Sequence, residues 1–379
     1  MSLLSAIFNC TALAPKQFVR VGKVPRSRHH AGSIMDGPIS TLMNDARSTF
    51  STLTGAGPTG SNESTYTVAI TGASGLYGRA IRDELFSKET MKGKTIKVVK
   101  LVRDPAKLKE DCLLWDQNAD GAALDPARLK GIDAVVHLAG ENVSTGTGPL
   151  GFLGIRPWTE RKKSTILSSR DRATRALAAA IERSGEKITF VSASGVGIYG
   201  DDAIGPDADI ATEKSDTSKT NFLAKVGRRW EEATSVIKSP ACRVVNLRIS
   251  PILSKNGGML GKLYPIFLLG GGGIVGSGKQ YLSFVSARDA ARIVVHVLET
   301  PSLSGPVNAC APNPCTNAEF TAALGKLIGR PTFLPLPSFA VSLLFGEMGD
   351  EMLLGGVRAV PEKLEKSRFQ FQHPSIESA

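Results

Sequence analysis

The chain has 379 residues, of which 42% are hydrophobic, and its formal net charge is +11 at pH 7. This length suits one large α/β domain or two lobes, and the composition excludes collagen, coiled-coil and membrane-bundle architectures. Apolar runs such as Ile293–Val295 and Leu343–Phe345 are far shorter than the roughly 20 residues that cross a bilayer, so we expect no transmembrane helix. Peripheral association with a membrane stays open.

The basic excess permits attraction to nucleic acid, anionic lipid or phosphorylated small molecules. Part of it lies at the N-terminus, where residues 1–35 contain five Lys and Arg residues and no Asp or Glu. No basic run with interleaved aromatic residues and no nucleic-acid motif is present, so we expect no nucleic-acid partner. An RNA-binding function would have only the net charge in its favour.

Five cysteines are scattered along the chain. The closest pair, Cys310 and Cys315, lacks the two-residue spacing of a zinc knuckle or a redox site. The odd number and the absence of a Cys/His cluster argue against a disulfide scaffold and against a bound metal. We therefore expect reduced, mostly buried thiols.

Residues 1–64 are rich in Ser, Thr, Gly, Asn and basic residues and show no sustained helical or strand period. Such a segment cannot bury enough apolar surface to fold alone. A short apolar region followed by a basic, acid-free stretch is typical of an organelle presequence, with the plastid favoured over the mitochondrion. A disordered tail without a targeting role is the alternative.

From Thr65 onward, apolar runs alternate with helical patterns. The run Tyr66–Thr71, a glycine-rich turn, a helix over Leu76–Ser87 and the run Ile96–Val102 form a βαβ unit. Further strands are predicted at Cys112–Trp115, Ala134–Leu138, Ile188–Val191 and Val244–Leu247, with helices at Arg161–Arg183 and Phe222–Ile237. Strands separated by helices predict a Rossmann-type, doubly wound parallel sheet covered on both faces.

After about Ser250 the pattern changes to a glycine-rich loop and three further helices, expected at Ala287–Leu298, Asn317–Leu327 and Ser338–Leu344. We expect a presequence and linker over residues 1–64, a dinucleotide-binding domain over 65–250 and a smaller C-terminal substrate lobe over 251–379. The smaller lobe would close over the carboxyl edge of the sheet, where ligands of doubly wound folds bind.

The strongest motif is Gly72-Ala-Ser-Gly75-Leu-Tyr-Gly78, directly after a strand and at the start of a helix. Missing side chains let the backbone approach a pyrophosphate at the positive end of the helix. An ordinary glycine turn is the alternative. We assign the cofactor contacts of this turn to Gly72, Ser74, Gly75, Leu76, Tyr77, Gly78 and Arg79.

The residue after the second strand distinguishes the two dinucleotides, because NAD binders usually place an acid there to bind the ribose hydroxyls. Here Arg103 comes first, and a guanidinium can bind the 2′-phosphate of NADP with paired charge-assisted bonds, with Arg79 as a second arginine that could assist. Asp104 keeps NAD as the less favoured alternative. Asp116 is a candidate for the adenine edge, and Leu138, Ala139 and Gly140 end the strand where the cofactor ribose would lie.

These motifs resemble the extended short-chain dehydrogenase/reductases. The resemblance rests on the glycine turn, on Ala139-Gly-Glu-Asn142 and on Ser192-Ala-Ser-Gly-Val-Gly-Ile-Tyr-Gly200. More narrowly, Trp158-Thr-Glu-Arg-Lys162, Gly257-Gly-Met-Leu260, Gly276-Ser-Gly-Lys-Gln280 and Leu354-Gly-Gly-Val-Arg358 are similar to the atypical, epimerase-like branch, also called cell-division-inhibitor-like. The similarity covers about residues 66 to 376.

Active members of this superfamily use a Tyr and a Lys four residues later on one helix, with a Ser at the preceding strand end. The resemblance gives the serine role to Ser194, with Ser192 as the alternative. The matching helix begins Asn221-Phe222-Leu-Ala-Lys225, with Phe where Tyr belongs and Lys at the third position instead of the fourth. Lys225 is the candidate contact to the cofactor ribose, although one residue turns a helix by about 100° from the position that the family uses.

Other polar residues are candidates for the substrate site. Glu141 and Asn142 follow the fourth strand, where ligands of doubly wound folds bind, and Glu141 is a catalytic candidate alongside Ser194. Lys262, Gln280 and Arg358 are polar positions in apolar or glycine-rich segments, and they could line a pocket for an anionic or sugar-like ligand.

The sequence therefore predicts an NADP-binding atypical short-chain dehydrogenase/reductase. The resemblance implies oxidoreductase or epimerase activity on a nucleotide-sugar-like or other small hydroxyl or carbonyl substrate, and homodimers are common in the superfamily. The missing Tyr-Lys pair favours the rival hypothesis, a non-catalytic NADP-binding regulator, because plant relatives of this branch are connected with plastid division.

Overall fold

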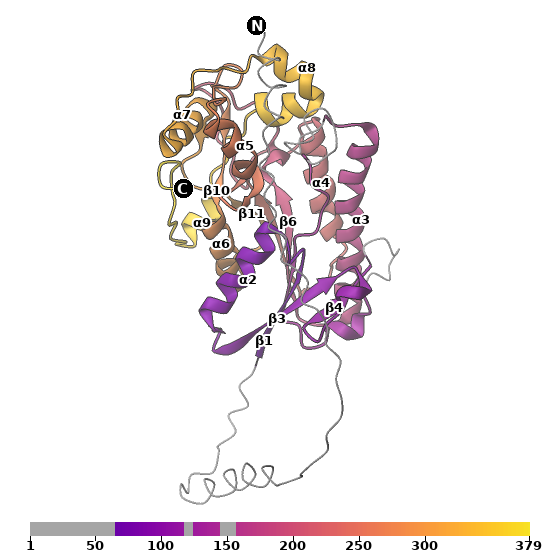
Figure 1. Ribbon diagram of the computed structural model, residues 1–379. Coiled ribbons are helices and arrows are strands. Elements are labelled where there is room, and N and C mark those ends of the chain that lie inside the picture. The colour runs from indigo at the N-terminus through magenta and orange to yellow at the C-terminus, as the bar shows by residue number, and fades with distance from the viewer. Residues whose placement is uncertain (1–64, 117–123, 145–156) are drawn as a thin grey trace, which may run out of the picture. The chain divides into compact units, whose positions relative to one another are not determined.

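A computed structural model describes residues 65–116, 124–144 and 157–379. The predicted presequence, residues 1–64, lies outside the described residues. The chain from residue 62 onward forms one compact unit. Its centre is a parallel sheet with helices on both sides (Figure 1). The doubly wound α/β fold that the sequence predicts is confirmed.

The main sheet has eight strands in the order β11-β7-β6-β5-β1-β3-β2, and β4 also pairs with β3. All its pairings are parallel except β2 with β3. The order reverses beside β1, which is the switch point of a Rossmann sheet. The strands are β1 (Thr65–Thr71), β2 (Thr90–Met91), β3 (Lys94–Val102), β4 (Cys112–Leu114), β5 (Ala134–His137), β6 (Thr189–Gly195), β7 (Arg243–Ile249) and β11 (Gly305–Ala309).

The central strands are buried on both faces, as near-continuous β-branched runs require. In β1, Val68 and Ile70 pack into one core with Ile81 of helix α2, while Ala69 packs into another with Leu177 of helix α3. Helices α2 and α6 therefore cover one face of the sheet, and α3, with α4 beside it, covers the other (Figure 1). Their bounds are α2 (Leu76–Lys88), α3 (Glu160–Ser184), α4 (Phe222–Thr234) and α6 (Ala287–Glu299).

The C-terminal region, residues 251–379, contributes to the main sheet and also forms a core of its own. Helix α6 and strand β11 belong to the main sheet and its core, although they follow residue 251. A separate core forms around Phe267, Phe284 and Phe320. The remaining elements of the C-terminal region are α5 (Gly258–Leu268), α7 (Asn317–Ile328), α8 (Ser338–Gly349), α9 (Glu362–Lys366) and the short pairs β8 (Ile252–Ser254) with β10 (Val285–Ser286) and β9 (Tyr281–Leu282) with β12 (Cys315–Thr316). Of these, α5, α7, β8, β9 and β12 contribute to the separate core.

Four short turns complete the described elements. They are the 3-10 turns η2 (Pro105–Lys107), η3 (Pro126–Leu129) and η5 (Val196–Tyr199) and the π-helical turn η6 (Asp350–Leu354). Among the residues that the structure describes, no helix is long and apolar enough to span a bilayer, and no His, Cys, Asp or Glu cluster has the make-up of a metal site. The described cysteines are unpaired thiols.

Candidate functional site

The glycine turn between β1 and α2 is tightly closed. Gly72 has a φ of +67°, a conformation that favours glycine, and its carbonyl accepts the Gly75 N–H at 2.9 Å. A Cβ at Gly78 would lie 2.3 Å from that same carbonyl oxygen and 2.7 Å from the Ala73 Cα. Helix α2 starts at Leu76 without a side-chain cap. The start of the helix therefore presents backbone N–H groups to a ligand, as a pyrophosphate site requires.

Thr71 joins the two strand ends that border this turn. Its Oγ1 accepts the backbone N–H groups of Leu138 and Ala139 at 2.9 and 3.1 Å and lies 2.9 Å from His137 Nδ1. Since the hydroxyl accepts two amide protons, its own proton points to His137 Nδ1, which leaves the ring proton on Nε2. That buried Nε2 has no partner among the described residues. Complete burial lowers the pKa of His137 to about 3, so the imidazole is neutral.

The arginines predicted to bind a 2′-phosphate lie at the rim of the turn. Arg79 Nη1 donates to the Ser74 carbonyl at 2.7 Å. Arg103 is exposed directly after β3. The carboxylate of Asp104 caps η2 by accepting the Ala106 N–H at 3.0 Å, so it is committed to its own turn.

Three more residues were predicted to contact the cofactor: Tyr77, Leu76 and Asp116. Tyr77 is half-buried, its hydroxyl donates to the Ala290 carbonyl of α6 at 3.0 Å, and burial of that hydroxyl raises its pKa. Leu76 lies beside Gly258 of α5. Asp116 is exposed after β4. Of these three, Tyr77 contributes its side chain to packing rather than to the ligand surface.

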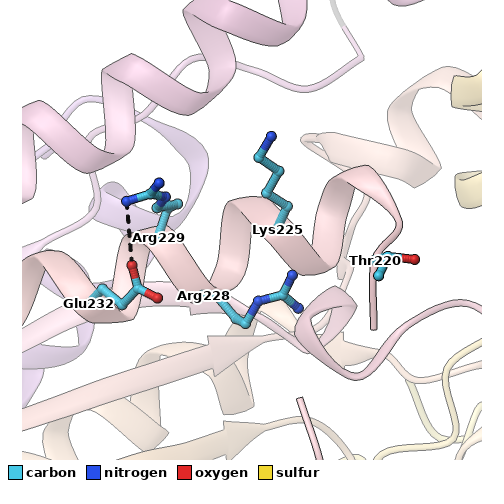
Figure 2. Close-up of a pocket in the computed structure, with 5 residues that line it drawn as sticks. All are labelled: Thr220, Lys225, Arg228, Arg229 and Glu232. Atoms are coloured by element: carbon cyan, nitrogen blue, oxygen red, sulfur yellow. Dashed lines mark ion pairs between the residues drawn. The ribbon is translucent and has the colours of Figure 1, made fainter. Parts of the chain in front are cut away.

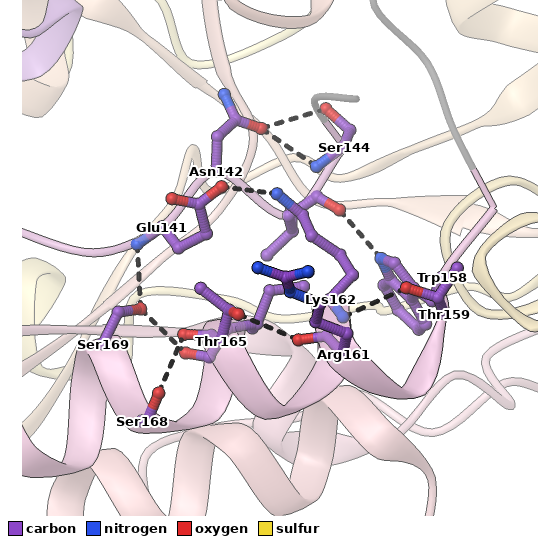
Figure 3. A network of polar contacts seen from close by, with 12 residues as sticks. Glu141, Asn142, Ser144, Trp158, Thr159, Arg161, Lys162, Thr165, Ser168 and Ser169 are labelled. Carbon is purple, nitrogen blue, oxygen red and sulfur yellow. Dashed lines mark hydrogen bonds and ion pairs between the residues drawn. The ribbon is translucent and has the colours of Figure 1, made fainter. Parts of the chain in front are cut away.

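The loop after β5 carries a polar network (Figure 3). The Glu141 carboxylate binds Lys162 Nζ at 2.5 Å, and the Glu141 N–H donates to Ser169 Oγ at 3.0 Å. Asn142 Oδ1 accepts both the N–H and the hydroxyl of Ser144, at 2.9 and 3.2 Å. Glu141 and Asn142 are therefore held in fixed positions by α3 and by their own loop.

Lys262 reaches this loop from α5 in the C-terminal region. Its Nζ donates to Ser144 Oγ at 2.7 Å, and partial burial lowers its pKa. Behind the same loop, the buried Arg170 guanidinium lies 3.3 Å from the point where a Cβ of Gly140 would stand, and it stacks over the Trp230 ring. The loop is thus bordered by basic groups from both parts of the fold.

Ser194 is the last residue but one of β6 and is part of a buried ion-pair network. Its Oγ donates to Glu231 Oε1 at 3.0 Å. Arg248 binds both oxygens of that carboxylate, at 2.7 and 2.8 Å, and also donates to the Tyr199 hydroxyl at 2.8 Å. Tyr199 in turn donates to Asn308 at 2.6 Å, and burial raises its pKa to about 12. Tyr199 is therefore a structural residue, and the proton of Ser194 is directed into the protein.

The face of α4 that packs on the strand ends contains no Tyr-Lys pair. Glu231 lies on this face, and one and two turns before it are Gly227 and Leu223. Leu223 lies 3.2 Å from the Cβ position of Gly197, and a Cβ at Gly227 would lie 2.8 Å from the Ile198 Cβ. The two positions that are four residues apart and face η5 are therefore apolar, and the second has no room for a side chain.

Phe222 and Lys225 lie on other faces of α4. The Phe222 ring packs against Trp158 at 4.8 Å between centroids. Lys225 is exposed and lines a surface hollow of about 480 Å³ with Thr220, Arg228, Arg229 and Glu232 (Figure 2). The structure therefore separates Lys225 from Ser194 and from the glycine turn.

The side chains of Gln280 and Arg358 donate hydrogen bonds to backbone carbonyls. The Gln280 amide is buried and donates to Val275 and Leu353 at 3.0 and 2.8 Å. Arg358 donates to Ala208 at 2.9 Å and stacks over Tyr281. Gln280 joins two segments of the C-terminal region, and Arg358 ties that region to the loop of Pro206 and Ala208, whereas Asn142 and Lys262 meet at one loop.

Three residues of the site were not singled out by the sequence. Glu231 orients Ser194, Lys162 pairs with Glu141, and Glu351 of η6 accepts the N–H groups of Phe222 and Leu223. Leu223, Gly227 and Glu231 share one face of α4 because they recur at intervals of four, but their sequence pattern does not show that this face packs on the strand ends. The contact of Glu351 has no local signal, because it spans more than 120 positions of sequence.

Comparison with known proteins agrees with this architecture. Residues 68–310 match the NAD dependent epimerase/dehydratase family, and residues 336–379 match a domain of unknown function. An epimerase family protein of Mycobacterium bovis is 39% identical over 82% of this chain and 95% of its own length. A chloroplastic SDR39U1 homologue of Arabidopsis thaliana is 31% identical over 84% of this chain and 86% of its own.

Among solved structures, that of human epimerase family protein SDR39U1 with NADPH superimposes with a TM-score of 0.70 at 29% identity, covering 83% of this chain and 97% of the human one. The resemblance to extended short-chain dehydrogenase/reductases that the motifs indicated is confirmed. The chain belongs to the NAD dependent epimerase/dehydratase family and is similar to its SDR39U1 proteins.

Proposed function

We propose that the protein binds NADP(H), in preference to NAD(H), at the carboxyl edge of the sheet. The observation that carries the proposal is the glycine turn, which a Cβ at Gly78 would fill, beside an uncapped helix start. Arg103 supports the preference for the 2′-phosphate, because the neighbouring Asp104 carboxylate is engaged in its own turn. The human relative whose structure was solved with NADPH supports the same cofactor.

In this proposal the backbone of Gly72, Ser74, Gly75 and Leu76 binds the pyrophosphate. Arg79 and Arg103 bind the 2′-phosphate, Asp116 the adenine edge, and Leu138, Ala139 and Gly140 the ribose. Bound NADPH supplies a hydride. Lys225 has no part in this site, since it lies on an outer face of α4.

We further propose oxidoreductase or epimerase activity on a nucleotide-sugar-like or other small hydroxyl or carbonyl substrate. The support is the polar cluster of Glu141, Asn142 and Lys262 beside the strand ends, together with Ser194. Because Glu231 accepts the Ser194 proton, Ser194 offers lone pairs and would accept a hydrogen bond from a substrate hydroxyl. Glu141 and Lys262 are the groups that would move a proton.

The test is to measure NADPH and NADH affinity by fluorescence titration, and then NADPH oxidation or sugar epimerisation with a panel of nucleotide sugars and small carbonyl compounds. NADPH binding with turnover of one substrate class supports the enzyme. Equal affinity for both dinucleotides refutes the cofactor preference.

A second candidate is a non-catalytic NADP-binding regulator, for example of plastid division. The observation in its favour is the inner face of α4, where Leu223 and Gly227 hold the two positions that could reach the site and Ile198 closes the second. Cofactor binding without turnover of any tested substrate, together with a stable protein partner, would select this function.

We propose that the protein is targeted to the plastid, with the mitochondrion as the second candidate. The chloroplastic Arabidopsis thaliana homologue supports it, as does the acid-free, basic composition of residues 1–35. Residues 1 to about 60, fused to a fluorescent reporter, should direct it to an organelle. A cytosolic reporter would refute the proposal.

A further inference from the structure

Arg170 of α3 is a buried cation that no carboxylate of the described residues binds. The residue is 9% exposed, and burial lowers the pKa of its guanidinium to about 10, so it remains charged at neutral pH. The charge of Glu141 opposes this effect, but the Glu141 carboxylate is bound to Lys162. A buried charge is costly unless an opposite charge and hydrogen-bond acceptors compensate it. The described part of the fold therefore leaves this cation without a counter-ion of its own.

The guanidinium also has donor capacity that these residues leave unused. Its Nη1 donates to the Ile166 carbonyl at 3.1 Å, and this is its one hydrogen bond to a described residue. Its face stacks on the Trp230 ring of α4, with Cζ 4.7 Å from the ring centroid. Because a guanidinium carries five N–H groups, several of them remain for a ligand. The stacked ring fixes the plane in which those groups point.

The order of the strands divides the proposed cofactor site into two halves. Arg103 follows β3, the glycine turn follows β1, and β5 lies on the opposite side of β1 from β3. A dinucleotide whose 2′-phosphate is bound by Arg103 and whose pyrophosphate is bound at the turn therefore places its nicotinamide nucleotide over β5 and β6. Arg170 reaches this second half, because its Cζ lies 3.3 Å from the point where a Cβ of Gly140, in the loop after β5, would stand.

The side chain of Arg170 points towards the carboxyl edge of the sheet. Strands β5 and β6 are parallel, so α3, which connects them, runs back from that edge. The bond to the Ile166 carbonyl, one turn earlier on α3, directs the guanidinium towards the start of the helix. The cations of α4 lie elsewhere, since Lys225, Arg228 and Arg229 all line the outer hollow (Figure 2). Helix α3, rather than α4, therefore brings a cation to the nicotinamide half of the site.

We propose that Arg170 binds the ribose hydroxyls of the nicotinamide half of NADP(H). The inference rests on the proposed cofactor site and adds to it a residue for the second nucleotide. Two N–H groups of a planar guanidinium can donate in parallel to neighbouring oxygens, and a ribose presents two adjacent hydroxyls. The phosphates of the same ligand bring negative charge that compensates the buried cation. Since the Trp230 ring already holds the guanidinium, little side-chain freedom is lost on binding.

The experiment measures the affinity of the full chain for three ligands by isothermal titration calorimetry. They are NADPH, 2′-phospho-ADP-ribose, which keeps the second ribose without nicotinamide, and 2′-phospho-ADP, which ends at the pyrophosphate. Arg170→Met should weaken binding of NADPH and of 2′-phospho-ADP-ribose at least about tenfold, because the paired bonds to the ribose are lost. Its affinity for 2′-phospho-ADP should equal that of the wild type, which also establishes that the variant folds.

The matched control is Arg172→Met, which alters an exposed arginine two residues further along α3 and should change none of the three affinities. Arg103→Ala should weaken all three, because each ligand contains the 2′-phosphate. If Arg170→Met fails to fold, Arg170→Gln, which keeps a donor for the Ile166 carbonyl but removes the charge, gives the same comparison.

Unchanged NADPH affinity in the folded Arg170 variant overturns the proposal and leaves the cofactor site intact. Equal weakening of NADPH and 2′-phospho-ADP overturns it too, since Arg170 would then act on the pyrophosphate. A wild type that binds none of the three ligands refutes the proposed cofactor site itself, and the inference with it.

Discussion

Glu351 caps the helix that begins at Phe222: its Oε1 accepts the Phe222 N–H at 2.7 Å, and its Oε2 accepts the Leu223 N–H at 2.9 Å. Partial burial raises the pKa of this carboxyl group, while the three hydrogen bonds that it accepts oppose the rise. A helix start that would otherwise attract an anionic ligand is thus satisfied by the chain itself. The C-terminal region thereby fixes α4, and with it the inner face that carries Leu223 and Gly227.

The first prediction concerns the choice between NADP and NAD. Arg103→Ala should weaken NADPH binding by about 1.5 to 3 kcal/mol, the value of a hydrogen bond to a charged group, and leave NADH binding nearly unchanged. Fluorescence titration with both dinucleotides measures this. Arg128→Ala, which removes an exposed arginine from η3, is the control and should change neither affinity. Equal weakening of both dinucleotides would remove Arg103 from the 2′-phosphate site.

The second prediction concerns the glycine turn. Gly78→Ala should lower NADPH affinity at least about tenfold and destabilise the fold, because its Cβ cannot stand 2.3 Å from the Gly72 carbonyl oxygen unless the turn moves. The matched control is Gly261→Ala in α5, where a Cβ meets no atom within 4 Å. That change should stabilise the protein by about 0.5 to 1 kcal/mol. Unchanged NADPH affinity in Gly78→Ala would mean that the turn does not bind the dinucleotide.

The third prediction concerns the buried imidazole of His137. Its pKa is about 3 in the fold and 6.5 as its ordinary value, so the unfolded chain binds the proton more tightly. The contribution of His137 to the free energy of unfolding is therefore fully present above pH 6.5 and is lost as the pH falls towards 3. Between pH 7 and pH 5 this group should cost the wild type about 2 kcal/mol of unfolding free energy.

His137→Asn keeps an acceptor for the Thr71 hydroxyl and cannot titrate in this range. Urea unfolding of both proteins at pH 7 and pH 5 should therefore show a smaller loss in the variant, whatever its stability at pH 7. Identical losses would mean that protonation of His137 does not contribute to acid unfolding.

Much of the sheet was predictable from the sequence. The strands β1, β3 and β5 are apolar runs bounded by turns, and α2 and α7 begin at the residues that the pattern indicated, Leu76 and Asn317. Strand β11 was missed, because Gly305-Pro-Val-Asn-Ala309 has little strand propensity and is held by its pairing with β7. Helix α5 was interpreted as a loop, since Gly258, Gly261 and Pro265 hide its helical period.

The site was predictable only where it is local. The glycine turn is contiguous in sequence, so its residues could be named directly. The face that a helix turns to the sheet depends on packing, and one residue of error rotates a position by about 100°. Sequence alone therefore gave Phe222 the tyrosine position, whereas Leu223, one residue later, packs against η5.

The last prediction is that tyrosine-based proton transfer does not operate in this protein. Phe222→Tyr should leave NADPH affinity intact and create no fast reduction, because that ring packs against Trp158 and lies under Lys163, away from Ser194. Leu223→Tyr places the hydroxyl on the inner face, but it should also fail to give rapid turnover, since Gly227 has no room for the accompanying lysine. A general acid typically contributes about 10² to 10⁴ in rate, so the wild type should turn over slowly or use another acid, with Glu141 and Lys262 as the candidates. Stopped-flow NADPH oxidation with the substrate panel distinguishes these outcomes. Wild-type turnover at about 1 to 10³ per second that Glu141→Gln and Lys262→Met leave unchanged would show that a proton donor elsewhere in the fold has been overlooked.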